Sequence, residues 1–332
     1  MADQAGNKPV ISVKRLTKQY GEVLAVNDIS FTVNLGEMFG FLGPNGAGKT
    51  TTINMLTGLA RSDAGTINVG GIDCTRNPKA AQHLVGVVPD ESNLYPELTG
   101  FDNLCFCAAL YGMRKKERQD RARELLDTFG LADAGNRKFG GYSKGMKRKL
   151  TFAAGIIHRP GILFLDEPTT GIDVASARQV RQIIAGLHGQ GTTVFLTTHY
   201  IEEAERLCER IAFIVDGRIV RTDRTADLLQ PVKGRNILLL SVSVSGAAIA
   251  EEMQRAFRSY RVQSTLPGEL RVESTEPVIV GPLVHFLEER GIQVTEARRQ
   301  VPSLEDVFVQ VTGIEAELMK KEKEKSEGVG NR

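Results

Sequence analysis

Residues 43–50, GPNGAGKT, constrain the fold of this 332-residue chain more than any other segment. They fit the pattern G-x-x-x-x-G-K-[ST], in which glycines let the backbone wrap closely around an anion. MFGFL before the loop predicts a strand, and TTINMLTGL after it predicts a helix whose N-terminus adds positive potential. The segment therefore predicts a phosphate-binding loop in an α/β fold. A glycine-rich turn that binds no ligand is the alternative.

The loop and a second segment supply residue types suited to phosphate chemistry. We expect Lys49 to place its charge on the β- and γ-phosphates of a nucleotide, and Thr50 to offer its hydroxyl to Mg²⁺. The apolar run ILFLDEP (162–168) predicts a buried strand that ends in two acids. Asp166 is expected to meet Mg²⁺ beside Thr50, and Glu167 to orient or deprotonate an attacking water. Adjacent acids are often merely solvated, but these two end a buried strand.

The run TVFLTTH (193–199) predicts another apolar strand, which ends at His199. A lone histidine is often incidental. This one closes a strand at the edge where parallel α/β sheets bind ligands, so we expect it to contact the γ-phosphate.

Short apolar runs alternate with helical stretches over residues 1–230, which predicts an α/β domain with a largely parallel sheet. Residues 101–134 contain two helix-like stretches with no strand between them. We therefore expect a helical insert over about residues 95–160. The charge run RKKERQDRAR (114–123) within it mixes both signs and predicts a solvated helix face rather than a binding patch.

A second domain is expected over residues 234–314, after a boundary marked by Pro231 and Gly234. Its runs follow the order β-α-β-β-α-β, which is the ferredoxin-like order. PSLEDVFVQVTG then predicts a closing helix with Ser303 as its N-cap. Residues 315–332 carry almost no apolar side chains and predict a charged, disordered tail or a frayed helix.

Charge and composition exclude some classes of function. The chain has 42 Lys and Arg against 40 Asp and Glu, and a net charge of +2 argues against a general nucleic-acid binder. Four scattered cysteines predict reduced thiols in a cytosolic protein. The polar N-terminus does not resemble a signal peptide, and no run approaches the roughly 18 apolar residues that span a bilayer. If the protein acts at a membrane, we expect another chain to cross it.

The segments GPNGAGKTT, YSKGM, ILFLDEPTTGID and LTTH occur in this order and together resemble the ATP-binding cassette (ABC) ATPases. The resemblance covers roughly residues 10–230. The C-terminal appendage and the PSLEDVF ending resemble the exporter branch, which includes drug-resistance, sodium-efflux and copper-related exporters. The resemblance implies a P-loop core with a parallel sheet, an antiparallel β subdomain and a helical insert, followed by a ferredoxin-like accessory domain.

The resemblance also implies roles for single residues. Tyr20 takes the place of an aromatic that stacks on adenine, although it also fits a simple surface tyrosine. Thr51 is expected at the α-phosphate, Asp173 in a loop that crosses between two cassettes, and His199 as the switch histidine. The implied ATP-binding set comprises Tyr20, Gly43, Pro44, Asn45, Gly46, Ala47, Gly48, Lys49, Thr50, Thr51 and Asp173, with Ser143 and Gly145 acting in trans.

The stretch YSKGMKRKL (142–150) falls on the family signature, usually written Leu-Ser-Gly-Gly-Gln. Ser143 and Gly145 match this pattern, whereas Tyr142, Lys144 and Met146 depart from it. Ser143 can cap the following helix, whose N-terminus would then face a phosphate. The apolar face of that helix is predicted to leave the cations at 147–149 solvated. In the family the signature meets ATP held by a second cassette, which implies a head-to-tail dimer.

One departure affects a metal contact. Asp90, in VGVVPDES, stands where the family usually has a glutamine that touches Mg²⁺ and the attacking water. A carboxylate can bind Mg²⁺ but would repel the γ-phosphate, and a solvated loop acid is the alternative. We expect the location to be the hinge of the helical insert.

Taken together, the resemblance implies an Mg²⁺-dependent ATPase subunit of an exporter. Its expected partners are a second cassette, as a homodimer, and an integral-membrane permease, and no nucleic acid is expected. Its expected place is the cytoplasmic side of the cell membrane, bound peripherally. The alternative is a soluble cassette ATPase that acts on ribosomes or nucleic acid. A P-loop kinase would explain GPNGAGKT but neither YSKGM nor LTTH.

Overall fold

The computed structural model describes residues 9–230, 234–244, 246–300 and 302–314. Two compact units divide the chain: one extends to Thr225 and includes residues 311–314, and the other extends from Ala226 to Gln310. The predicted tail at 315–332 lies outside the described residues. Within the described part, no helix has both the length and the apolar character needed to cross a bilayer.

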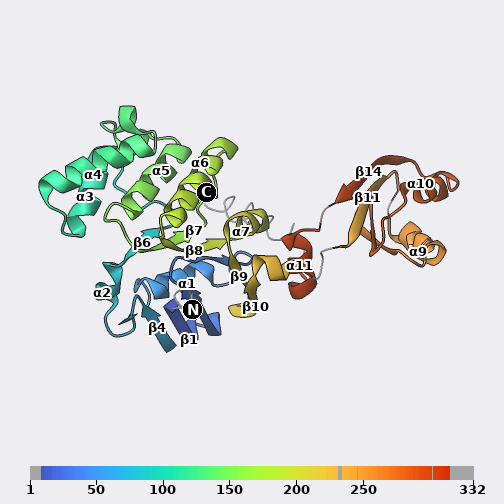
Figure 1. Cartoon of the computed structure of the whole chain (residues 1–332), viewed down its shortest axis with the longest axis horizontal. Coiled ribbons are helices and arrows are strands. Elements are labelled where there is room, and N and C mark those ends of the chain that lie inside the picture. Colours follow the sequence, from blue (N-terminus) through green and yellow to red (C-terminus); the bar gives the residue numbers. More distant parts are fainter. Residues whose placement is uncertain (1–8, 231–233, 245, 301, 315–332) are drawn as a thin grey trace, which may run out of the picture. The chain divides into compact units, whose positions relative to one another are not determined.

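The first unit is built on a six-stranded sheet in the order β10-β9-β3-β8-β7-β6 (Figure 1). All neighbouring strands are parallel except β9 and β10. Every residue of β3, β7 and β8 is buried, which is why these strands read as unbroken apolar runs rather than alternating ones. The strands are β3 (Met38–Leu42), β6 (Val85–Val88), β7 (Ile162–Asp166), β8 (Thr193–Thr198), β9 (Arg210–Val215) and β10 (Arg218–Arg224).

A second, antiparallel sheet has the order β2-β1-β4-β5 and forms the β subdomain. Phe31 of β2 contacts Phe39 and Phe195 of the central sheet, with ring centroids 5.7 Å and 5.8 Å apart. These aromatic rings join the two sheets into one core. The strands are β1 (Pro9–Tyr20), β2 (Val23–Asn34), β4 (Ala64–Val69) and β5 (Ile72–Asp73).

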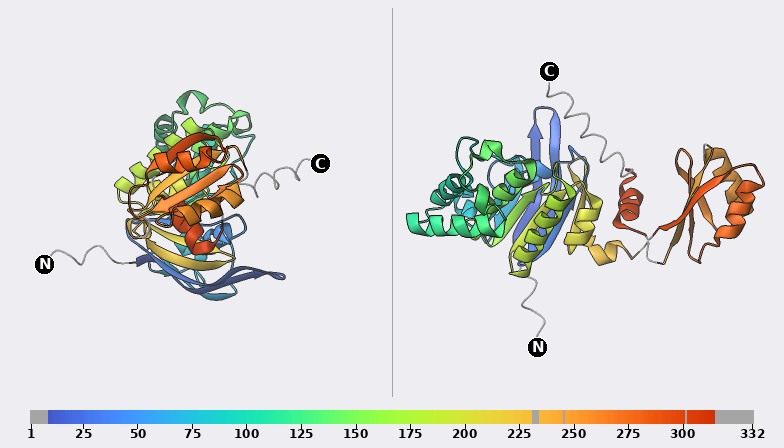
Figure 2. Two further views of the ribbon diagram at one scale, coloured as in Figure 1. Left: turned by 90° about the vertical axis from the view of Figure 1, so that its right-hand side faces the viewer. Right: turned by 90° about the horizontal axis from the view of Figure 1, so that it is seen from above.

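The chain between β6 and β7 is helical, as predicted for the insert, and its helices (green) group together in Figures 1 and 2. They are α3 (Gly100–Leu110), α4 (Lys115–Thr128) and α5 (Lys144–Gly155). Most of the charged residues of α4 are exposed or partly exposed, which confirms the solvated face. The other helices of this unit are α1 (Lys49–Leu56), α2 (Pro78–Gln82), α6 (Val174–Gly189) and α7 (Ile201–Leu207), and α8 (Thr225–Leu228) follows β10.

The second unit contains a four-stranded sheet in the order β12-β13-β11-β14, and all neighbouring strands are antiparallel. Along the chain its elements run β-α-β-β-α-β and then one more helix. Leu238, Leu240 and Met253 are buried in a separate apolar core. The elements are β11 (Asn236–Val242), α9 (Gly246–Ala256), β12 (Arg261–Leu266), β13 (Glu269–Ser274), α10 (Val280–Glu288) and β14 (Val294–Gln300). The last helix, α11 (Leu304–Thr312), begins in this unit, and its final two residues are assigned to the first unit.

Candidate functional site

The loop between β3 and α1 has the form of an anion cradle. Gly46 and Gly48 have φ angles of 79° and 96°, a region that side chains disfavour. A Cβ at Gly48 would also overlap the carbonyl oxygen of Ala25 in β2. No side chain caps α1 at Gly48 and its first turn holds no acid, so its N–H groups can bind an anion.

Lys49 is folded back against this loop. Its ammonium donates to the carbonyl oxygens of Gly43 at 2.8 Å and Pro44 at 3.0 Å. It also lies 3.2 Å from Oε1 of Glu167, and the lysine is only 6% exposed. A buried cation must be paired, and here the partners are the loop and the acid at the end of β7. Lys49 and Glu167, predicted separately from the sequence, thus share one site.

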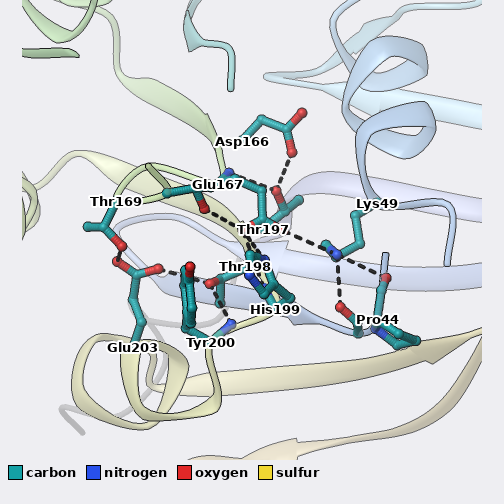
Figure 3. Close-up of polar contacts among 12 residues, drawn as sticks. Pro44, Lys49, Asp166, Glu167, Thr169, Thr197, Thr198, His199, Tyr200 and Glu203 are labelled. Atoms are coloured by element: carbon teal, nitrogen blue, oxygen red, sulfur yellow. Dashed lines mark hydrogen bonds and ion pairs between the residues drawn. The ribbon is translucent and has the colours of Figure 1, made fainter. Parts of the chain in front are cut away.

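The end of β7 places two buried acids in different surroundings (Figure 3). Asp166 accepts a hydrogen bond from the hydroxyl of Thr197 in β8. Glu167 turns back into the site through a left-handed backbone with a φ of 47°. Its Oε2 accepts from Nδ1 of His199 at 2.7 Å and from the Thr170 hydroxyl at 3.2 Å. The two acids therefore have distinct partners, and Glu167 alone contacts the histidine.

Opposing effects set the charge of Glu167. Burial raises its pKa, but the hydrogen bond from His199 and the charge of Lys49 lower it more, so the pKa lies below its ordinary value of 4.5. The group is therefore a carboxylate at neutral pH. Its Oε1 is buried and accepts no hydrogen bond among the described residues. Oε1 also lies 3.2 Å from the ammonium of Lys49, and an ionised carboxylate in this place can accept a hydrogen bond from a water molecule.

A third buried carboxylate, which the sequence did not single out, binds residues at the same strand ends. Glu203 of α7 is buried and accepts from the hydroxyls of Thr169 at 2.7 Å and Thr198 at 2.9 Å (Figure 3). Burial raises its pKa despite these two hydrogen bonds. The residue lies four positions after His199 in a helix rich in acids, so no spacing distinguishes it from its exposed neighbour Glu202.

Ser143, Gly145 and Asp173 form a separate cluster. The Ser143 hydroxyl accepts from the N–H of Met146 at 3.3 Å and caps α5, as predicted. A Cβ on Gly145 would come within 2.5 Å of the Ser176 hydroxyl oxygen. Asp173 caps α6 by accepting from the N–H and hydroxyl of Ser176, and these bonds lower the pKa of Asp173. Among the described residues, no hydrogen bond or ion pair joins this cluster to Lys49 or Glu167.

Comparisons with known proteins decide the family. The family described as "ABC transporter" matches residues 26–170. The linearmycin resistance ATP-binding protein LnrL of Bacillus subtilis (strain 168) is 36% identical over 310 residues, which cover 92% of this chain and 98% of that protein. The chain belongs to the ABC transporter family.

Other proteins that are similar to this ABC ATPase support the same family assignment. The Nod factor export ATP-binding protein I of Burkholderia orbicola (strain AU 1054) is 35% identical over 305 residues, which cover 92% of this chain and 97% of that one. A solved structure, the dimeric post-hydrolysis state of the ATP-binding cassette MJ0796 bound to ADP and Pi, has a TM-score of 0.61 and 26% identity. It covers 65% of this chain and 98% of its own. The ATPase cassette therefore accounts for about two thirds of the present chain.

Tyr20 and Asp90, which the sequence of this ABC ATPase predicts to contact adenine and Mg²⁺, are both exposed. Tyr20 ends β1 with its side chain 49% exposed, and the ammonium of Lys18 lies 5.0 Å from the centroid of its ring. Tyr20 pairs with Val23 of β2. The carbonyl oxygen of Ala25, two residues further along that strand, lies close to Gly48 of the phosphate loop. Asp90 is exposed after β6, at the start of the helical insert, and its role with Mg²⁺ stays a prediction.

The cations that follow the signature are not all solvated. Lys147 and Lys149 are partly exposed, but Arg148 is only 6% exposed, so the prediction of a solvated basic face is wrong at this residue. Its guanidinium donates to the backbone carbonyls of Pro168, after β7, and of Asp90, after β6. A pattern of polar and apolar residues along a helix treats arginine as exposed. It does not include the length of the side chain, which lets arginine bind distant segments.

The contacts of Tyr142 explain why a tyrosine stands at the first position of the signature. The family pattern has leucine here, whereas the buried Tyr142 hydroxyl donates to the carbonyl of Ala134 at 2.7 Å. Its ring packs beside Phe139, with centroids 5.7 Å apart. A Cβ at Gly100, the first residue of α3, would overlap the tyrosine hydroxyl. The tyrosine thus fixes the signature to the helical insert.

Proposed function

We propose that this ABC ATPase is the energy-supplying subunit of an exporter and acts with a separate membrane permease. The arrangement of Lys49, Glu167 and His199 beside an uncapped helix N-terminus is the observation that carries the proposal for its chemistry. The export role is supported by the relatives, whose names describe linearmycin resistance and Nod factor export. We place the chain on the cytoplasmic face of the cell membrane, where ATP is available.

The phosphates of ATP are proposed to bind the loop of residues 43–48 and the first turn of α1. Lys49 supplies a cation to the β- and γ-phosphates, Thr51 lies at the α-phosphate, and Tyr20 stacks on the adenine. The absence of a cap and of an acid from the first turn supports this assignment, because an acid there would compete with the phosphates.

Mg²⁺ is proposed to be held by the Thr50 hydroxyl and the Asp166 carboxylate. The two side chains supply the hard oxygen donors that Mg²⁺ prefers, with substrate phosphates and water completing its shell. When bound, Mg²⁺ neutralises charge on the phosphates.

Glu167 is proposed to orient the water that attacks the γ-phosphate and to accept its proton. Oε1, which accepts no hydrogen bond among the described residues but is paired with the ammonium of Lys49, supplies the acceptor. The hydrogen bond between Oε2 and His199 fixes the carboxylate plane. His199 is thereby held at the same edge, where it is proposed to contact the γ-phosphate. Hydrolysis breaks the bond between the β–γ bridging oxygen and the γ-phosphorus, with the water oxygen taking its place.

The site is proposed to be completed by a second copy of the chain. Among the described residues, no hydrogen bond or ion pair joins Ser143 or Gly145 to Lys49, so we infer that the signature serves the nucleotide of another copy. A head-to-tail homodimer would place each signature against the nucleotide of the other copy, with Asp173 at the crossing. The dimeric cassette bound to ADP and Pi supports this arrangement.

Replacing Glu167 by glutamine tests the proposed chemistry. We expect Glu167→Gln to bind ATP but to hydrolyse it about 10²–10⁴-fold more slowly, because the amide cannot accept a proton. The ATP-bound variant should accumulate as a dimer in size-exclusion chromatography. Phosphate release and binding of a fluorescent ATP analogue provide the two readouts.

Glu202→Gln is the matched control, since the Glu202 side chain is 83% exposed on α7. It should hydrolyse ATP at the parent rate. Hydrolysis by Glu167→Gln at that same rate would show that Glu167 is not the general base.

A further inference from the structure

Arg148 binds the segment that carries Glu167. Its Nε donates to the carbonyl oxygen of Pro168 at 2.7 Å. Its Nη2 donates to the carbonyl oxygens of Asp166 at 2.9 Å and Glu167 at 3.0 Å. Three successive carbonyls are thus held by one guanidinium. Because Glu167 has the left-handed φ of 47°, which costs energy in a residue other than glycine, such support fixes where its side chain points.

The other edge of the same guanidinium binds the entrance to the helical insert. Its Nη1 donates to the carbonyl oxygen of Asp90 at 2.9 Å and to that of Pro89. These two residues connect β6 to the insert. Arg148 itself belongs to α5, the helix that Ser143 caps. One buried side chain therefore joins the signature helix, the entrance of the insert and the loop of the proposed general base.

The chemistry of the site requires an arginine. The side chain donates to five carbonyl oxygens, and the guanidinium has five N–H donors in a fixed arrangement. A lysine ammonium has three donors at a single point and cannot bind both of these segments at once. Burial disfavours the charged guanidinium, whereas the charges of Asp90 and Asp166 favour it. A neutral replacement would leave buried carbonyls without donors.

We propose that Arg148 is a positioning residue that couples the place of the helical insert and signature helix to the orientation of Glu167. The proposal rests on the general-base role given above to Glu167. No hydrogen bond or ion pair joins Arg148 to a phosphate-loop residue among the described residues, so we expect it to act on the rate of hydrolysis and not on ATP binding. When the insert moves against a partner, Arg148 thereby changes the position of Glu167 relative to the attacking water.

Arg148→Lys and Arg148→Gln test the proposal, with Lys149→Gln as the matched control on the same helix. We expect kcat to fall by up to about 10²-fold in Arg148→Gln, the cost of a misplacement of about 1 Å, and by less in Arg148→Lys. The KM for ATP and the amount of fluorescent ATP analogue bound per chain should match those of the parent. Lys149→Gln should retain the parent kcat.

A double variant shows whether Arg148 acts through Glu167. Arg148→Gln combined with Glu167→Gln should be no slower than Glu167→Gln alone, because the second loss removes the group that the first misplaces. Losses that multiply in the double variant would overturn the proposal. So would a parent kcat in both Arg148 variants, or a kcat that falls in proportion to the amount of nucleotide bound. A parent rate in Glu167→Gln would instead reject the general base itself.

Discussion

At the scale of single residues, the site depends on a balance of buried charges. Lys49, Glu167 and His199 are all nearly inaccessible to solvent, and burial alone would neutralise such groups. Their mutual contacts, at 3.2 Å and 2.7 Å, keep the carboxylate ionised. In the proposed mechanism, groups arranged in this way around Glu167 would preorganise the site, which would lower the reorganisation needed during hydrolysis.

The lowered pKa of Glu167 predicts a pH dependence of stability. Because its folded pKa lies below 4.5, the group contributes stability that is complete above pH 4.5 and is lost as pH falls through the folded pKa. The free energy of unfolding of the parent, relative to Glu167→Gln, should therefore decline in acid. Urea titrations across this range provide the measurement. A difference independent of pH would contradict it.

Glu203→Gln should show the opposite sign in the same titrations. Burial raises the pKa of Glu203, so the cost of ionising it grows as pH rises above the ordinary value of 4.5. The parent should lose stability relative to Glu203→Gln as pH rises above that value, because the amide removes this cost. Exposed Glu202→Gln should leave the pH slope unchanged. A falling difference in acid would reject the raised pKa.

At the scale of elements, the sequence predicts the buried strands well and the long-range polar contacts poorly. Continuous apolar runs identify β3, β7 and β8, and the loop pattern locates the start of α1. Arg148 and Glu203 escape prediction because their partners lie far along the chain, such as Pro168 and Thr169. A local pattern of polar and apolar letters cannot show that a charged residue is covered by a distant loop.

The contact between α5 and β6 predicts a specific loss of stability. A Cβ at Gly86 would overlap the carbonyl oxygen of Gly155 and lie 2.7 Å from a ring carbon of Pro160. Backbone atoms cannot rotate away, so Gly86→Ala should destabilise the fold by about 1–3 kcal/mol. Denaturant unfolding measures the change. Gly161→Ala is the control, because its Cβ meets nothing within 4 Å, and equal stabilities of the two variants would contradict the prediction.

At the scale of the whole molecule, the proposed ATP chemistry uses residues of only one of the two compact units. Every residue proposed to contact nucleotide lies in the first unit, between Tyr20 and His199. The second unit has its own apolar core. Its sequence carries no catalytic motif, and we propose that it stabilises or regulates the dimer, as the resemblance to the exporter branch implies.

Removing residues from 231 onward tests whether the second unit stabilises or regulates the dimer. We expect the shortened chain to bind the fluorescent ATP analogue as the parent does, because its phosphate loop is intact, and to self-associate more weakly. Analytical ultracentrifugation with ATP and Glu167→Gln in both chain lengths gives the comparison. Unchanged self-association and unchanged ATPase activity would leave the second unit without the proposed role.

The contact between Tyr142 and Gly100 has an evolutionary consequence. The hydroxyl of Tyr142 occupies the space that a Cβ at the first position of α3 would fill. A chain that carries the usual leucine in the signature has no hydroxyl there, and its residue at the start of α3 is free to change. The two positions should therefore covary among ABC ATPases, with tyrosine in the signature restricting its distant partner to glycine.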